Sequence, residues 1–316
     1  MQKNRLGRSE LMVSPLAFGG NVFGWTVDEK TSFALLDAFI AAGFNFIDTA
    51  DVYSRWVKGN EGGESERIIG KWLKQSGKRD QVVIATKVGM EMGSNAKGLS
   101  KAYIMQAIEH SLARLQTDYI DLYQAHIFDE TTPCEETLEA FTSLAEQGKV
   151  RVIGASNHTA SQLARTLNTS DQKNLARYES LQPLYNLYDR HEYEAELEVL
   201  CRQQELGVIS YFSLASGFLT GKYRSEKDLA QGQRGEMVRK YLNPRGLNIL
   251  AALDKVSQQY QAIPAQVALA WLIARPSITA AIASATSIKQ LQDLVKATQL
   301  QLDVKAIDLL NEASAV

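Results

Sequence analysis

The stretch FNFIDTADVY, residues 44–53, decides the fold of this chain. An apolar run ends at Asp48, and Tyr53 follows in polar sequence. The same pattern, an apolar run that ends at a polar residue, recurs in QVVIATK, which ends at Lys87, and in YIDLYQAH, which ends at His126. Because parallel strands of a barrel open at one common mouth, we expect these four polar side chains to lie close together.

Outward from this stretch, short apolar runs alternate with amphipathic segments along the chain. The runs are rich in Val, Ile, Tyr and Phe, as expected for parallel strands whose two faces are both buried. Besides the three runs above, five more occupy residues 12–20, 150–157, 178–186, 207–215 and 278–284. Eight such units in a chain of 316 residues predict a (β/α)8 TIM barrel, with residues 1–316 forming a single domain.

An alternative fold and several irregular segments also have to be considered. A doubly wound open sheet is the alternative, but FGGNVFGW at 18–25 is not the GxGxxG that opens a dinucleotide-binding helix in that fold. Helices are expected near 246–260 and 264–275. Residues 216–245 form the least regular region. Residues 54–65 carry several Gly and Asn residues, and we expect a mobile flap there.

Composition excludes several classes of protein. The chain is 45% hydrophobic with a net charge of -2, so no bulk attraction to nucleic acid or membrane is expected. Cys134 and Cys201 stand far apart, and no Cys/His spacing indicates a metal site. There is neither a signal-peptide pattern nor an apolar run of the ~18–20 residues that span a bilayer. We therefore expect a cytoplasmic location and no metal.

The four strand-end residues suit proton transfer to a carbonyl oxygen. A free tyrosine has a pKa of ~10, and a nearby ammonium such as that of Lys87 is expected to lower it. Asp48 would hold Lys87 in place, His126 would orient the carbonyl, and Tyr53 would give up the proton. Each residue alone also fits a structural role, as a salt bridge, a solvated strand end or a core histidine. Their joint placement favours one site.

A second chemistry is possible on the same barrel. A lysine at a strand end, such as Lys87, suits a Schiff-base aldolase. However, a Schiff-base lysine must lose its charge before it attacks, and Asp48 nearby would favour the charged form. Borohydride trapping of a substrate on Lys87 would support this alternative.

Several motifs together resemble one known family. DTADVY, ATK and QAH are similar, residue for residue, to the Asp–Tyr–Lys–His tetrad of the aldo-keto reductase superfamily. The similarity continues through GESERIIGKWLK, IGASNH, SLQPLYN and GFLTGKY, and therefore covers nearly the whole chain. The resemblance extends to the branch of the family that includes potassium-channel beta subunits. The resemblance implies reduction of aldehydes or ketones, with Asp48, Tyr53, Lys87 and His126 as catalytic residues.

The resemblance also implies an extended nicotinamide dinucleotide across the barrel mouth. Ser156, Asn157 and Gln182 match residues that bind the carboxamide, and Tyr211 matches a ring that stacks on the nicotinamide. The pyrophosphate loop would run from Ser213, where the family usually has proline, to Gly217. The other matched cofactor-binding positions are Gly20, Asn21, Leu214, Ala215, Ser216, Lys222, Arg234, Ser284, Thr286, Gln290 and Asp293.

Departures from the family pattern leave the choice of cofactor open. Many members have arginine where Gln290 stands, and often asparagine where Leu294 stands. Selectivity for the 2′-phosphate would then rest on Lys222, Arg234 or the Ser/Thr hydroxyls, and Arg224 adds positive charge nearby. NADP(H) is the expected cofactor, with NAD(H) as the alternative.

The expected partner is a small-molecule carbonyl substrate. Trp25, Trp56 and Phe128 follow the first, second and fourth apolar runs, and we expect them to form an apolar wall of the substrate pocket. A third hypothesis for the function, also from the resemblance, is that the chain is an NADPH-binding sensor subunit with little turnover. Neither the natural substrate nor the oligomeric state follows from the sequence.

Overall fold

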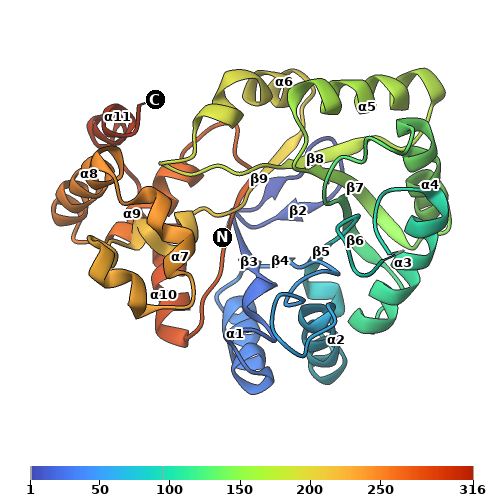
Figure 1. The fold of residues 1–316 in the computed structure, drawn as a ribbon, viewed down its shortest axis with the longest axis horizontal. Helices are drawn as coiled ribbons and strands as arrows, with labels where there is room; N and C mark the ends of the chain where they lie inside the picture. The colour runs from blue at the N-terminus through green and yellow to red at the C-terminus, as the bar shows by residue number, and fades with distance from the viewer. Residues whose placement is uncertain (1, 95, 316) are drawn as a thin grey trace.

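The computed structural model describes residues 2–94 and 96–315. Eight parallel strands close into a barrel in the order β10-β3-β4-β5-β6-β7-β8-β9. The prediction of a (β/α)8 TIM barrel is thereby confirmed (Figure 1). The strands are β3 (Leu16–Gly19), β4 (Phe46–Asp48), β5 (Val83–Val88), β6 (Ile120–Ala125), β7 (Val150–Ser156), β8 (Tyr178–Gln182), β9 (Gly207–Ser210) and β10 (Ala280–Ala283).

Helices cover the outside of the barrel. The first six units contribute α1 (Glu29–Ala41), α2 (Glu64–Ser76), α3 (Lys101–Leu115), α4 (Cys134–Glu146), α5 (Ala160–Lys173) and α6 (Glu198–Gln203), the last preceded by a π-helical turn at Tyr193–Leu197. Local signals set their ends. Thr159 and Gln162 form a capping box at the start of α5, and Gly77 ends α2 in the left-handed region at φ 64°.

The C-terminal part adds four further helices on one side of the barrel. These are α8 (Pro244–Tyr260), α9 (Pro264–Ile273), α10 (Ile288–Ala297) and α11 (Val304–Ala313), coloured orange to red in Figure 1. The predicted helices near 246–260 and 264–275 correspond to α8 and α9. The segment before them is more ordered than its sequence indicates: it contains the short helices η4 (Ala215–Thr220), η5 (Glu226–Gln231), α7 (Gly235–Val238) and η6 (Arg239–Tyr241).

A hairpin at the N-terminus was not predicted. Strands β1 (Asn4–Arg5) and β2 (Met12–Val13) pair antiparallel, so the apolar run at 12–20 divides between this hairpin and β3. Leu6 and Leu11 are buried and belong to the same apolar cluster as the barrel interior. The hairpin therefore packs against the interior residues of the barrel instead of extending its first strand.

Both faces of the strands are buried, as the sequence predicts for a parallel sheet. Inward residues such as Phe46 and Leu122 form the barrel interior, and outward residues such as Ile47 and Tyr123 pack under the helices. At the C-terminal end of the strands the interior changes from apolar to polar. Asp48, Lys87 and Gln182 are buried there, which places the expected site at this mouth.

Candidate active site

Lys87 is the centre of the predicted tetrad. Its Nζ donates to Asp48 Oδ1 at 2.9 Å, to Asp48 Oδ2 at 2.8 Å and to the Thr49 carbonyl at 2.8 Å. It also lies 3.0 Å from Tyr53 Oη, which in turn donates to Asp48 Oδ2 at 3.2 Å. Asp48 and Lys87, which are 39 residues apart in the sequence, are therefore in direct contact. Asp48 and Lys87 are almost fully buried, and the pair is compensated by these charge-assisted hydrogen bonds.

The protonation of Tyr53 differs from the sequence-based expectation. Burial, followed by the charge of Asp48, raises the pKa of Tyr53 well above its ordinary value. The prediction that Lys87 brings this pKa below its ordinary value is wrong, because burial and the Asp48 carboxylate, which also binds the Lys87 ammonium, outweigh the effect of that ammonium on the phenol. Burial lowers the pKa of Lys87, while Asp48 raises it. Tyr53 is thus a protonated phenol at neutral pH.

His126 lies directly after β6, beside Tyr53. The centroids of the two rings are 6.2 Å apart. Burial and the nearby Lys87 lower the pKa of His126 well below its ordinary value, so its imidazole is neutral. Asn157 Nδ2 donates to the His126 carbonyl at 2.9 Å and helps to fix the backbone there. A neutral imidazole can donate one N–H to an oxygen of a substrate.

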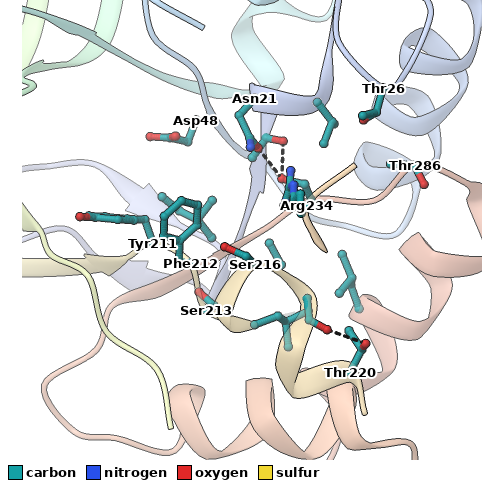
Figure 2. A pocket seen from close by; sticks show the side chains of 18 of the residues that line it. Asn21, Thr26, Asp48, Tyr211, Phe212, Ser213, Ser216, Thr220, Arg234 and Thr286 are labelled. Atoms are coloured by element: carbon teal, nitrogen blue, oxygen red, sulfur yellow. Dashed lines mark hydrogen bonds between the residues drawn. The ribbon is translucent and has the colours of Figure 1, made fainter. Parts of the chain in front are cut away.

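A cavity of about 810 Å³ opens above the tetrad. Figure 2 shows Asp48 and Tyr211 at one end of the view and Thr286 at the other. Most of the predicted site residues line this cavity: Asn21, Asp48, Tyr53, Trp56, His126, Ser156, Asn157, Gln182, Tyr211, Ser213, Leu214, Ser216, Gly217, Lys222, Arg234, Ser284, Thr286, Gln290 and Asp293.

Five predicted residues lie elsewhere. Lys87, Gly20 and Ala215 are buried behind the lining. Trp25 does not line the cavity, although its ring packs against two lining residues, Trp56 at 5.6 Å between ring centroids and Arg234 at 5.1 Å. The prediction for Phe128 is wrong. Its ring centroid lies 5.2 Å from that of His158, and it lines a separate small cavity, so it does not form a wall above the tetrad.

The polar residues expected at the nicotinamide end form one network. Gln182 Nε2 donates to Asp48 Oδ1 at 2.8 Å. Ser156 Oγ donates to the Gln182 carbonyl at 2.9 Å, and Tyr211 Oη donates to Asn157 Oδ1 at 2.7 Å. The side chain of Asn157 is therefore already engaged at both ends. Gln182 and Tyr211 remain available to a planar amide-bearing ring.

The loop after β9, expected to bind the pyrophosphate, has an unusual backbone conformation. Three successive residues, Ala215, Ser216 and Gly217, have φ values of 48°, 57° and 101°, in or near the left-handed region. Two of the three backbone N–H groups are used within the loop, since Ala215 donates to the Phe212 carbonyl at 2.6 Å and Gly217 donates to the Leu214 carbonyl at 2.8 Å. Ser213, which stands where the family usually has proline, donates its Oγ to the Ser210 carbonyl at 3.2 Å. This bond holds the loop without the proline.

Two cations face the same part of the cavity. Within the part of the chain that the structure describes, Lys222 and Arg234 form no salt bridge. Instead, the Lys222 ammonium lies 4.8 Å from the Tyr223 ring, and the Arg234 guanidinium lies 5.1 Å from the Trp25 ring. Arg224, by contrast, is bound at 2.7 Å to both oxygens of Asp254, and its charge is therefore neutralised.

The expected adenosine end is formed by the loop after β10 and the start of α10. Gln290 Oε1 accepts from the Thr286 backbone N–H at 2.8 Å and from Thr286 Oγ1 at 3.0 Å. Ser284 Oγ donates to the Gly19 carbonyl at 2.7 Å, which ties this loop to β3. Gln290 thus orders the loop from within, where many relatives would place a charged arginine.

Sequence reasoning missed several lining residues. Among them, Val52 and Met90 lie in loops after β4 and β5, and Thr26 lies in the loop before α1. Ile263 and Ala265 come from the start of α9. Apolar residues in loops carry no pattern that distinguishes a cavity wall from ordinary packing. Only the position of Val52 next to Tyr53 offered a signal.

The described residues contain no group of three or more His, Cys, Asp or Glu side chains arranged to hold a metal ion. Over the same residues, no helix is both long and apolar enough to cross a membrane.

Comparisons with known proteins agree with this geometry. The model of the Aldo/keto reductase family matches residues 15–315. An uncharacterized oxidoreductase, YrpG of Bacillus subtilis, is 36% identical, with 99% of this chain and 95% of that protein covered. The aldo-keto reductase YhdN of the same organism is 35% identical over 92% of this chain and 85% of its own length.

A further relative has a different kind of name. A probable voltage-gated potassium channel subunit beta of rice (Oryza sativa subsp. japonica) is 34% identical, with 94% of this chain and 91% of that protein covered. The matches extend over nearly the full length of each relative. The chain therefore belongs to the aldo/keto reductase family and is an oxidoreductase of that family.

Proposed function

We propose that this protein reduces aldehydes or ketones to alcohols, reversibly, with a nicotinamide dinucleotide and with Tyr53 as the general acid. The single observation that carries the proposal is the position of Tyr53 Oη, 3.0 Å from Lys87 Nζ and 3.2 Å from Asp48 Oδ2, at the floor of the large cavity. A phenol held in this way can deliver a proton to an oxygen above it.

The residues around the cavity fit a dinucleotide. Tyr211 offers a ring face and Gln182 an amide at the tetrad end, while Lys222 and Arg234 offer positive charge to phosphates farther along the cavity. Ser284, Thr286 and Gln290 would hold the adenosine end. When bound, a reduced nicotinamide supplies the hydride that the carbonyl carbon accepts.

The chain's own residues would carry the proton side of the reaction. The neutral His126 donates an N–H to the carbonyl oxygen and orients it toward Tyr53. As the carbonyl carbon gains hydride, the Tyr53 O–H bond breaks and the alcohol O–H bond forms. The negative charge left on Tyr53 lies 3.0 Å from the Lys87 ammonium, which stabilises it. Lys87 thus favours the phenolate that forms during the reaction, although burial and Asp48 keep the pKa of the resting phenol above its ordinary value.

NADP(H) is the proposed cofactor, because Lys222 and Arg234 line the cavity and form no salt bridge with any residue that the structure describes. The proposal includes a cytoplasmic location and residues 1–316 as one functional domain.

Fluorescence titration with NADPH and NADH, followed by addition of a generic aldehyde, tests the proposal. We expect binding, tighter for NADPH, and steady oxidation once aldehyde is present. Failure of either dinucleotide to bind would overturn the proposal and direct attention to Lys87 as a Schiff-base residue.

A second candidate function follows from the rice relative named as a potassium channel subunit beta. In that case the chain would bind NADPH as a sensor subunit and turn over very slowly. The same experiment separates the two functions, because tight binding without oxidation favours the sensor. Turnover well above one per minute, together with no partner in a pull-down, favours the reductase.

A further inference from the structure

Gln124 is a buried polar residue for which the proposed reaction gives no role. It lies in β6, two residues before His126, and its neighbours in register are Lys87 on β5 and Gly154 on β7. Its side chain is fully buried. Since alternate residues of a strand point to the same face, Gln124 faces the barrel interior with His126, next to Lys87.

Gln124 reaches the tetrad through Gln182. The Gln182 Nε2 donates one hydrogen to Asp48 Oδ1 at 2.8 Å, and Gln124 Oε1 lies 3.4 Å from the same nitrogen, where it can accept the other hydrogen. A primary amide has two such hydrogens. The two contacts together fix which end of the Gln182 amide is turned down toward the tetrad.

This fixed orientation determines what Gln182 offers to a ligand. A reversed amide would bring its oxygen to the Asp48 carboxylate and also to the Gln124 oxygen, and both contacts would join two acceptors. With the nitrogen turned down, Gln182 Oε1 is left without a hydrogen bond to any described residue, while Gln182 lines the cavity. Gln182 thus offers an acceptor to a ligand N–H.

The cost of Gln124 argues for a role at the site. Its Nε2 is buried without a hydrogen-bond partner among the described residues, as is Ser180 Oγ two strands away. A buried unpaired polar group lowers stability, whereas an apolar side chain of the same size would not. Gln124 is therefore poorly explained by packing, and the one side-chain hydrogen bond that it makes with a described residue is to Gln182.

We propose that Gln124 is a positioning residue that holds the Gln182 amide so that its oxygen accepts from the carboxamide N–H of the nicotinamide. This inference rests on the proposed function, since it assumes that a nicotinamide binds above Gln182. It makes Gln124 a determinant of which pyridine substituent the site prefers, without any contact between Gln124 and the cofactor.

The test compares two cofactors that differ only in the group that Gln182 would contact. NADP⁺ has a carboxamide with N–H donors, and its 3-acetylpyridine analogue has an acetyl group with none. Calorimetric dissociation constants are measured for the wild type, for Gln124→Met and for the control Ser180→Ala. Ser180 is a second buried interior residue with an unpaired polar atom and no bond to Gln182. If the wild type binds only the NAD⁺ series, the corresponding pair is used.

We expect the wild type to bind the carboxamide cofactor about tenfold more tightly than the acetyl analogue, as one hydrogen bond allows. Gln124→Met should lower this ratio, although not to one because the bond from Gln182 Nε2 to Asp48 Oδ1 at 2.8 Å remains, and Ser180→Ala should leave it unchanged. Equal weakening of both cofactors, or an unchanged ratio in Gln124→Met, would overturn the inference. Absence of binding by the wild type would instead refute the proposed function.

A thermal melt of each variant shows whether it is folded. Gln124→Met removes an unpaired buried amide, so its melting temperature should not fall. If it does fall, Gln124→Asn provides the second variant, because its amide is one methylene shorter and cannot reach Gln182. The same decrease in the preference for the carboxamide cofactor is expected there, and an unchanged preference would also refute the inference.

Discussion

Tyr53 is the residue on which the proposed reduction depends most directly. Tyr53→Phe removes the proton but keeps the ring beside His126 and Trp56. We expect the turnover number for an aldehyde to fall by ~10²–10⁴-fold, while the dissociation constant for NADPH changes little. Steady-state kinetics and a fluorescence titration measure the two quantities. A variant that keeps the wild-type rate would rule out Tyr53 as the acid.

Asp51 allows a prediction about stability and pH. It is buried next to the site, and burial followed by the charge of Glu66 raises the pKa of its carboxyl to about 8. Between its ordinary pKa of 3.8 and this value, the unfolded chain has lost the proton and the folded chain keeps it. The contribution of Asp51 to the free energy of unfolding therefore falls as the pH rises through this range, by at most ~1.4 kcal/mol per pH unit, and is constant above it.

Asp51→Asn should remove this dependence, since an amide stays neutral at every pH. The variant is expected to match the wild type near pH 4 and to be more stable at pH 8. Urea unfolding at several pH values measures the difference. A gap that does not widen between these pH values would show that Asp51 ionises normally in the folded protein.

The residue types of the tetrad could be predicted from the sequence, but their electrostatics could not. Asp48, Lys87 and His126 come at strand ends, and the barrel brings strand ends together. The raised pKa of Tyr53 depends on its burial and on the Asp48 carboxylate, which only the folded structure fixes. Phe128 was misplaced for a similar reason, since the path of a loop decides where its side chains point.

Among the elements, β7 requires a glycine at its centre. A Cβ on Gly154 would lie 2.2 Å from Ser180 Oγ on the neighbouring strand β8 and 3.3 Å from Leu122 Cδ1 on β6. Gly154→Ala should therefore push these strands apart and lower the free energy of unfolding by ~1–3 kcal/mol. Denaturant unfolding gives this value directly.

Two further variants make the prediction about β7 specific. Adding Ser180→Gly to Gly154→Ala removes the closest clashing atom and should restore part of the loss. Gly93→Ala is the matched control, because the nearest atom to its Cβ would be 3.9 Å away. If Gly154→Ala is as stable as Gly93→Ala, then β7 and β8 tolerate a wider spacing than the structure implies.

The elements themselves differ in how well their sequences reveal them. Strands such as β5 and β6 are six residues long, buried on both faces and mostly apolar, so they stand out. The hairpin strands β1 and β2 have two residues each, too few for any periodicity. The short helices between Ala215 and Tyr241 are equally hidden, because they are held by contacts with the rest of the molecule.

On the scale of the whole molecule, segments far apart in the sequence meet beside the cavity. Arg234 lies in the segment between β9 and α8, and its guanidinium stacks on Trp25 from the loop after β3. Trp25 in turn contacts Trp56, and Trp56 contacts Tyr53. The segment at 221–241 is thus connected to the catalytic end by aromatic contacts, and it carries the two cations, Lys222 and Arg234, that face the cavity.

This arrangement predicts that a dinucleotide stabilises the segment at 221–241 against proteolysis. Phosphates between Lys222 and Arg234 would tie the segment to the barrel mouth, and the local opening that trypsin requires would become rarer. Saturating NADPH should slow cleavage within the segment at least several-fold, as measured by mass spectrometry of the fragments.

Two variants test whether the cations cause this protection. In Arg234→Gln the protection should be smaller. The control Arg239→Gln also removes a trypsin site, but Arg239 is paired with Glu226 and Glu236 and does not line the cavity, so full protection should remain. If NADPH binds the wild type without changing cleavage, the segment does not close over the cofactor, and its cations act from positions that are already fixed.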